Sequence, residues 1–176
     1  EESGGTWTQV GTDIDGEAAG DHFGWSVALS SDGSRLAAGG YYNDANGSNA
    51  GHVRVYEESG GAWTQLGDDI DGEASGDHFG WSVALSSDGT RLAVGAIYND
   101  GGGSNSGHVR VFDLVGSTWT QVGSDIDGEA ANDEFGRSVA LSSDGTRLAV
   151  GGRGNDGGGT DSGHVRVFEE SGGTWT

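Results

Sequence analysis

A repeat of 56 residues constrains the fold of this chain more than any other feature of its sequence. The period is marked by two series of aromatic residues: Trp7, Trp63, Trp119 and Trp175, and Phe23, Phe79 and Phe135. It divides the chain into repeats at 1–56, 57–112 and 113–168, and residues 169–176 start a fourth. Because EESGGTWT stands at both ends, we expect a chain that begins and ends inside a repeat, as a segment of a longer protein or a processed product would.

Composition narrows the possible partners. The chain has 37 Gly, no Pro, Cys or Met, and a formal net charge of −20. Such a charge repels the phosphates of nucleic acids and anionic membrane surfaces, whereas it attracts divalent cations. No apolar run is long enough to span a membrane, so we expect neither nucleic acid binding nor membrane insertion. The periodic aromatic and aliphatic residues predict a folded chain in spite of the glycine content.

Each repeat contains four short stretches with the alternation typical of β-strands and none with helical periodicity. In the first repeat, FGWSVALS places Trp25, Val27 and Leu29 on one face, and the Asp-Gly pair in SDGS predicts a hairpin. RLAAGG, HVRVY and TWTQVG supply three further strands. The prediction is an all-β chain of three tandem four-stranded antiparallel sheets, each one blade of a β-propeller.

These motifs resemble the FG-GAP repeat of integrin-α-like β-propellers. The resemblance rests on SVALS, LAVG, GHVRV(Y/F) and three Phe-Gly pairs, Phe23-Gly24, Phe79-Gly80 and Phe135-Gly136, and it covers essentially the whole chain. It implies a ring of blades in an extracellular adhesion or interaction protein. Two departures stand out: GGY, GAI and GGR lack the family's Pro, and SSDG(S/T)R replaces its aspartate-rich calcium turn with a single carboxylate.

The resemblance also assigns strands to blades. It makes FGWSVALS the innermost strand and TWTQVG the outermost strand of the preceding blade, so that blades span 22–67, 78–123 and 134–176. Residues 1–11 then supply an outer strand of a neighbouring blade. Both ends look like joints, and we expect the chain to form part of a larger ring or assembly.

The phrase DIDGEAAGD and its two counterparts are the strongest candidate site. Each carries carboxylates at positions one, three, five and nine, a spacing with which a loop can wrap Ca²⁺, the one cofactor that the sequence suggests. The alternative is a tight connection between blades, in which the ninth residue caps backbone N–H groups and the other acids are solvated. The candidate ligands are Asp13, Asp15, Glu17 and Asp21, then Asp69, Asp71, Glu73 and Asp77, then Asp125, Asp127, Glu129 and Asp133.

A second candidate is the polar loop NDANGSNAG with its counterparts. Its amide and carboxylate groups could bind a sugar or a cation, although such residues more often only form turns. Asn46-Gly47-Ser48 is a glycosylation sequon, which makes Asn46 a candidate acceptor. The candidate ligand-binding residues are Asn43, Asp44, Asn99, Asp100, Asn155 and Asp156.

Catalysis finds little support in the sequence. There is no Cys or Lys nucleophile, and His52, His108 and His164 recur at one repeat position, which favours a structural role. Trp25 and Trp81 could stack on a sugar, or could pack between blades. We therefore predict no enzyme but an extracellular or cell-surface structural or adhesive module that assembles with copies of itself or adjoining repeats into a larger propeller or a fibre-like polymer. The alternative is a glycan- or calcium-dependent binding propeller with glycans or extracellular proteins as partners.

Overall fold

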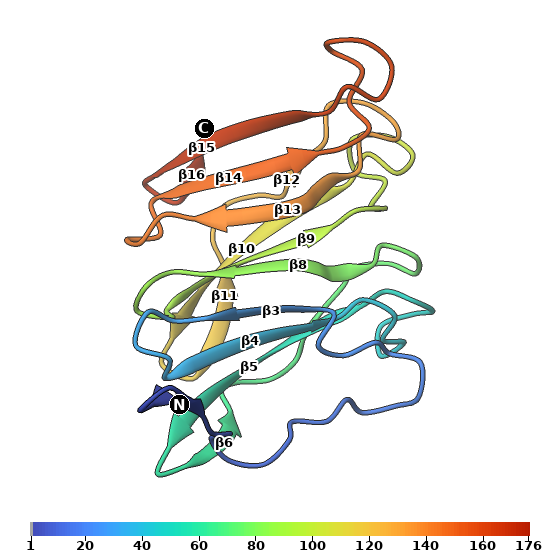
Figure 1. Cartoon of the computed structure of the whole chain (residues 1–176). Coiled ribbons are helices and arrows are strands. Elements are labelled where there is room, and N and C mark those ends of the chain that lie inside the picture. The colour runs from blue at the N-terminus through green and yellow to red at the C-terminus, as the bar shows by residue number, and fades with distance from the viewer. Residues whose placement is uncertain (1) are drawn as a thin grey trace.

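The computed structural model describes residues 2–176, and they form three antiparallel sheets stacked one on another (Figure 1). Blade 1 consists of β3 (Ser26–Leu29), β4 (Arg35–Gly40), β5 (His52–Ser59) and β6 (Ala62–Gln65). Blade 2 consists of β8 (Phe79–Leu85), β9 (Arg91–Ala96), β10 (His108–Val115) and β11 (Thr118–Gln121). Blade 3 consists of β13 (Phe135–Leu141), β14 (Arg147–Gly152), β15 (His164–Ser171) and β16 (Thr174–Trp175). The prediction of an all-β chain of propeller blades is confirmed.

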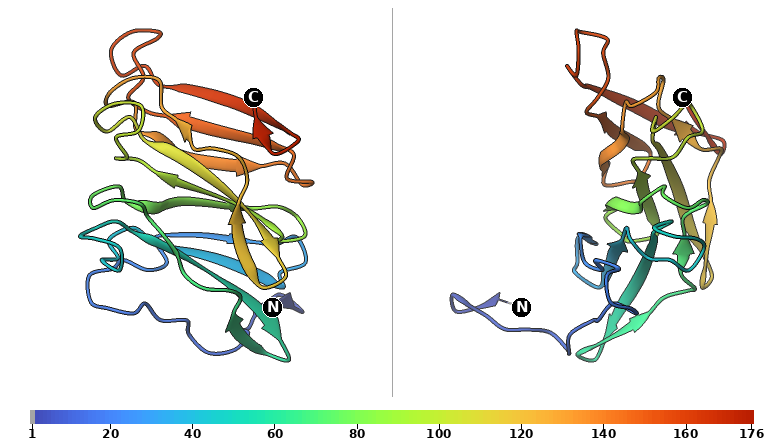
Figure 2. Two further views of the ribbon diagram at one scale, coloured as in Figure 1. Left: turned by 180° about the vertical axis from the view of Figure 1, so that it is seen from behind. Right: turned by 90° about the vertical axis from the view of Figure 1, so that its right-hand side faces the viewer.

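Four very short strands complete the fold: β1 (Glu2–Ser3), β2 (Thr6–Trp7), β7 (Ile70–Asp71) and β12 (Ile126–Asp127). The β1–β2 hairpin projects away from the blades (Figure 2). The strand β7 pairs with the start of β5, and β12 pairs with the start of β10. Blades 1 and 2 thus each gain a fifth strand that the sequence pattern did not predict. No helix long and apolar enough to cross a membrane occurs in residues 2–176.

The Asp-Gly hairpins form as predicted. In the first, Gly33 adopts a φ of 73°, and Asp32 Oδ1 accepts hydrogen bonds from the Ser30 hydroxyl (2.7 Å) and the Ser34 amide (2.9 Å). The left-handed backbone costs glycine little, and the carboxylate closes the turn. This turn sets the β3–β4 register, in which Leu29 lies opposite Leu36.

The core lies between the blades, not within any one of them. The β5 residues Val53 and Val55 are at most 2% exposed, because they pack against the Phe79, Val83 and Leu85 side of blade 2. The same contact recurs one repeat later between blades 2 and 3. Most of the apolar residues of a blade are therefore buried where another blade covers it.

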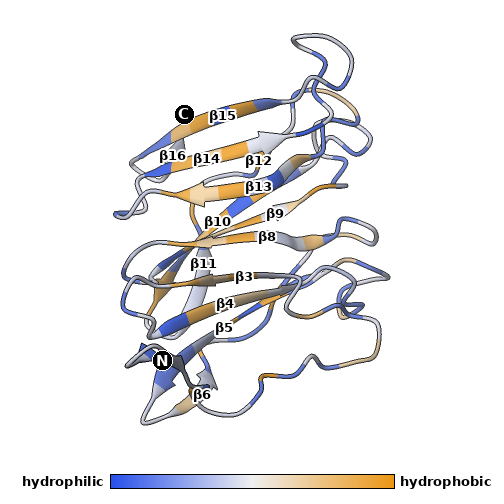
Figure 3. Ribbon diagram, viewed as in Figure 1, coloured by the Kyte–Doolittle hydropathy of each residue, from blue (hydrophilic) through white to orange (hydrophobic). Residues whose placement is uncertain are grey.

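Both ends of the stack leave this kind of surface open. On blade 3, Val165 and Val167 are 71% and 66% exposed, although they correspond to the buried Val53 and Val55. Their strand, β15, has hydrophobic segments and lies at the end of the stack (Figure 3). On blade 1, Trp25, Val27 and Leu29 are all more than half exposed. The predicted alternation along this strand is present, but its apolar side faces outward because no blade within residues 2–176 covers it.

Candidate functional site

The aspartate at the ninth position of each acidic phrase is buried against the polar loop. Asp21 accepts a hydrogen bond of 2.9 Å from the Asn43 side chain, and Asp77 accepts one of 2.9 Å from Asn99. The third pair, Asp133 and Asn155, is bonded in the same way at 3.0 Å. Two stretches that the sequence presents as separate candidates are thus joined in every blade.

Burial shapes the ionisation of this aspartate. It raises the pKa of Asp77, while the hydrogen bond from Asn99 opposes the rise. In the third repeat Asp133 also accepts the Ala130 amide at 3.1 Å, which is the backbone capping expected of this position. The Asp–Asn pair therefore anchors the connection between blades.

The remaining polar-loop groups close turns within their own loops. Asn43 Oδ1 accepts the Ala45 amide at 2.9 Å, and Asp44 Oδ1 accepts the Asn49 amide at 2.7 Å. The pairs Asn99-Asp100 and Asn155-Asp156 make the equivalent bonds. The side chain of Asn46 is exposed and donates to the Gly72 carbonyl at 2.7 Å. Ligand binding by these loops and glycosylation of Asn46 stay predictions.

Acidic positions one and five come together across two different phrases. Glu17 of the first phrase and Asp69 of the second both lie beside His52, the first residue of β5. His52 Nδ1 is 3.5 Å from Asp69 Oδ2 and 3.9 Å from Glu17 Oε2. The sequence pattern instead placed the four carboxylates of one phrase around one ion. Calcium binding by that loop stays a prediction.

The same grouping recurs one repeat later. His108 lies with Glu73 and Asp125, and His108 Nδ1 is 3.7 Å from Asp125 Oδ2. In the third repeat, His164 Nδ1 is 3.9 Å from Glu129 Oε2. Sequence reasoning missed this cluster, although one signal was available, since the histidine and both carboxylates share the period of 56 residues.

The third acidic position uses its backbone. The backbone carbonyl groups of Asp15, Asp71 and Asp127 each accept a hydrogen bond from an arginine in the third strand of the blade that follows. The donors are Arg54, Arg110 and Arg166, at 3.2, 2.6 and 3.2 Å. Each of these arginines also lies over a phenylalanine ring, as Arg110 lies 4.3 Å from the ring centre of Phe79. These residues fasten the phrase to the blade next to it.

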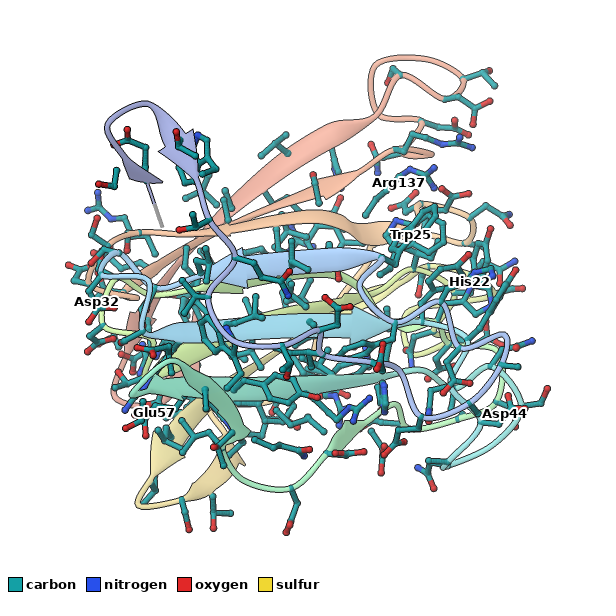
Figure 4. The ribbon with its side chains drawn as sticks, turned by 60° about the horizontal axis from the view of Figure 1, so that its bottom comes forward. His22, Trp25, Asp32, Asp44, Glu57 and Arg137 are labelled. Carbon is teal, nitrogen blue, oxygen red and sulfur yellow. The ribbon has the colours of Figure 1, made fainter. Side chains whose placement is uncertain are left out.

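Aromatic side chains gather at one end of the inner strands. The ring of Trp25 lies 5.1 Å from that of Trp81, and Tyr41 is 4.9 Å from both. Arg137 takes the tryptophan position in blade 3 and lies 5.3 Å from the ring of Trp81. Trp25 and Arg137 lie at the same end of the blades, opposite Asp32 (Figure 4). Trp25 is 53% exposed, so the group presents an aromatic surface to solvent.

A family model described as FG-GAP repeat matches residues 7–56, 70–112 and 119–168. The chain belongs to the FG-GAP repeat family. The predicted family resemblance is therefore confirmed, with one match in each repeat. No curated protein matches the chain.

Solved structures share the fold at low sequence identity. The periplasmic gluconolactonase PpgL of Pseudomonas aeruginosa is 19% identical, with a TM-score of 0.54, over 82% of this chain and 38% of its own. The β-propeller domain of the Trilobed protease from Pyrococcus furiosus, which has an open velcro topology, is 14% identical, with a TM-score of 0.51. The match covers 86% of this chain and 40% of that structure's chain. Kuenenia stuttgartiensis hydrazine synthase is 16% identical, with a TM-score of 0.52, and the match covers 86% of this chain and 35% of that structure's chain. This FG-GAP repeat chain thus spans 40% or less of each of these three structures.

Proposed function

We propose that this chain is a non-enzymatic structural or adhesive module that acts outside the cell by packing blade on blade with further copies of itself or with adjoining repeats. One observation supports this above all others. Val165 and Val167 of blade 3 are exposed, although their counterparts in blades 1 and 2 are completely covered by the next blade. An exposed apolar face of this kind favours association.

The two open faces have the same chemistry as the two sides of an internal junction. At the first junction, the Ser26 hydroxyl donates to the Gly80 carbonyl at 2.7 Å, and at the second, Ser82 donates to Gly136 at 2.7 Å. A blade placed beyond blade 3 would let Ser138 donate to Gly24 of the added copy in the same way. Val165 and Val167 on blade 3 of one copy and Val27 on β3 of the next copy would then be buried against each other.

The charged and aromatic ends of the faces are also complementary. Blade 3 carries Arg137 and Arg153 at the place where blade 1 carries Trp25 and Tyr41. Arg137 already lies over Trp81 of blade 2, so a second copy would bring Trp25 to its other side. Because closed propellers have about four to eight blades, three blades require further blades to complete a ring.

The proposal is tested by the molar mass in solution, measured by light scattering on wild type and two variants. Val167→Arg places a charge on the open face of blade 3, and Val115→Arg places the same charge on an equally exposed valine at the outer end of β10. We expect wild type and Val115→Arg to associate, with mass rising with concentration, and Val167→Arg to remain monomeric. A wild-type monomer of 17.9 kDa at every concentration would contradict the proposal.

We also propose that the module has no catalytic activity. One similar structure is a gluconolactonase, but a likeness at 19% identity extends only to the fold. The hollow of about 490 Å³ on blade 3, which Arg137, Arg153 and His164 line, opens on the face where a further blade would sit. We expect no turnover of gluconolactone by the purified chain, and sustained hydrolysis lost in Arg153→Ala would contradict this.

A second function is favoured by the exposed aromatic surface. Trp25, beside Tyr41 and Tyr42, could stack on the apolar face of a sugar ring, as a glycan-binding propeller would require. A glycan array compares wild type with Trp25→Ala and with Trp7→Ala, which removes an exposed tryptophan from the β1–β2 hairpin. Binding of one sugar class that is lost only in Trp25→Ala would support this function.

A further inference from the structure

We propose that two clusters in this chain, Glu17–His52–Asp69 and Glu73–His108–Asp125, each bind one divalent transition-metal ion, of which Zn²⁺ suits the ligands best. Each cluster offers one imidazole nitrogen and two carboxylates. This site differs from the calcium loop considered above, because its ligands come from two successive phrases and a β-strand. It does not require a second copy of the chain.

The distances fit an ion after a small adjustment. The candidate ligand atoms of each cluster all lie within 4.8 Å of one another. In the first cluster His52 Nδ1 is 3.5 Å from Asp69 Oδ2 and 3.9 Å from Glu17 Oε2. Around a tetrahedral zinc ion with bonds of about 2.0–2.2 Å, ligand atoms are about 3.4 Å apart. Both carboxylates are partly exposed, so their side chains can move to close the difference between 4.8 Å and about 3.4 Å.

The histidines supply an independent observation that points to a ligand. The side chains of His52 and His108 are 0% and 1% exposed, and both ring nitrogens of each lack a hydrogen-bond partner among the described residues. Buried polar atoms in native proteins are nearly always paired. His52 Nδ1 lies near both carboxylates of its cluster and His108 Nδ1 lies near Asp125, so an ion among the three groups would give that nitrogen a partner.

The ionisation state of the rings suits metal binding. Burial lowers the pKa of His52, and it lowers that of His108 to about 4, so both imidazoles are neutral at pH 7. A neutral imidazole with two carboxylates carries the two negative charges that balance a divalent cation. In the first cluster the nearby arginine does not occupy the facing oxygen, since Arg54 approaches Oε1 of Glu17 while His52 faces Oε2.

The ligand types distinguish between metals. Imidazole with carboxylates suits zinc and its first-row neighbours, whereas Ca²⁺ and Mg²⁺ take oxygen ligands. Solvent can supply the fourth ligand, because Glu17 and Glu73 are nearly half exposed. The third repeat brings only Glu129 and His164 together, at 3.9 Å. We therefore expect two ions per chain.

The test is a calorimetric titration of the full chain with Zn²⁺ at neutral pH and physiological salt, with Co²⁺ absorption as a second readout of coordination. Wild type is expected to bind two ions, Asp69→Asn one, and the double variant Asp69→Asn/Asp125→Asn none. Asp68→Asn is the matched control, because it removes the same charge from the exposed neighbouring position and is expected to keep both ions. Thermal unfolding without metal establishes that each variant folds.

Three outcomes would overturn the proposal. They are an absence of Zn²⁺ binding to wild type, an unchanged number of ions in the Asp69→Asn/Asp125→Asn variant, and displacement of Zn²⁺ by an equal concentration of Ca²⁺. If the double variant does not fold, Glu17→Gln and Glu73→Gln replace it, because these side chains are exposed and each removes one ligand. The titration is repeated in the Val167→Arg background, because in a head-to-tail stack Asp13 of the next copy would lie beside Glu129 and His164 and complete a third cluster.

Discussion

The amide nitrogen of Ser31 lies 2.9 Å from the carbonyl oxygen of Ser87, the residue at the same position one repeat later. Ser87 in turn donates to Ser143, also at 2.9 Å. A residue and its own counterparts are therefore linked from blade to blade along the stack. Such a series can continue through any further blade, because each member is both donor and acceptor.

The first prediction concerns the close approach of blades at glycine. A methyl group on Gly95 would overlap the Gly136 carbonyl of blade 3, whereas one on Gly151 would meet only the Ser138 hydroxyl, at 2.6 Å. We expect Gly95→Ala to lower the free energy of unfolding by about 1–3 kcal/mol and Gly151→Ala by clearly less. Denaturant unfolding measures the free energy of unfolding of both variants. Both are made in a Val167→Arg background, so that no second copy covers Gly151. Equal losses would show that the junction is looser than the structure has it.

The second prediction concerns an arginine that bridges blades 2 and 3. Arg91 forms a two-point contact with Asp113 at 2.6 and 2.7 Å and donates to the Gly145 carbonyl at 3.0 Å. Its counterpart Arg147, on the open face, is 65% exposed and meets Glu169 at 3.4 Å. We expect Arg91→Ala to cost about 1.5–3 kcal/mol of stability. Arg147→Ala is the matched control, and in a Val167→Arg background, where no second copy covers it, it should cost less than about 0.5 kcal/mol.

The third prediction concerns acid. Hydrogen bonds from the Ser30 hydroxyl and the Ser34 amide and hydroxyl lower the pKa of Asp32 to about 2, and equivalent bonds lower that of Asp144 to about 2. A depressed pKa in the folded state stabilises the protein above the unfolded pKa near 3.8, and this stability is lost as the pH falls towards 2. We expect the free energy of unfolding to decline between pH 4 and 2.

The control for this prediction is the pair of variants Asp32→Asn and Asp68→Asn. Urea unfolding from pH 6 to pH 2 should show a shallower decline in Asp32→Asn, because the titrating turn carboxylate is absent. Asp68→Asn should keep the wild-type slope. An acid decline that is the same in all three proteins would rule out the turn carboxylates as its cause.

The sequence predicted the fold well because the elements are local. The Asp32-Gly33 turn and the alternation along β3 can be read from neighbouring residues, and the period then supplies the other blades. The strand β7 escaped prediction because two residues, Ile70 and Asp71, carry no alternation of their own. Only their pairing with β5 of blade 1 makes them a strand.

The sequence predicted the candidate site residues but not their grouping. The carboxylates of one acidic phrase are close together in the sequence, but the structure gives them different partners. Asp77 accepts a hydrogen bond from Asn99, whereas Glu73 lies beside His108. These partners are distant along the chain, and they meet only because the strands of blade 2 fold together. No spacing within a single phrase contains that information.

The most direct test of blade-on-blade association uses the absence of cysteine from the chain. If copies stack head to tail, Ser143 of one copy meets Ser31 of the next, as Ser87 meets Ser143 within a chain. In Ser31→Cys/Ser143→Cys, blade 2 separates the two thiols of one chain, so a disulfide can form only between copies. The single variants are the controls, since each carries a cysteine on one face alone. On mild oxidation and non-reducing electrophoresis, the account predicts a ladder of covalent oligomers for the double variant and little cross-linking for the singles, whereas a double variant that cross-links no more than the singles would contradict it.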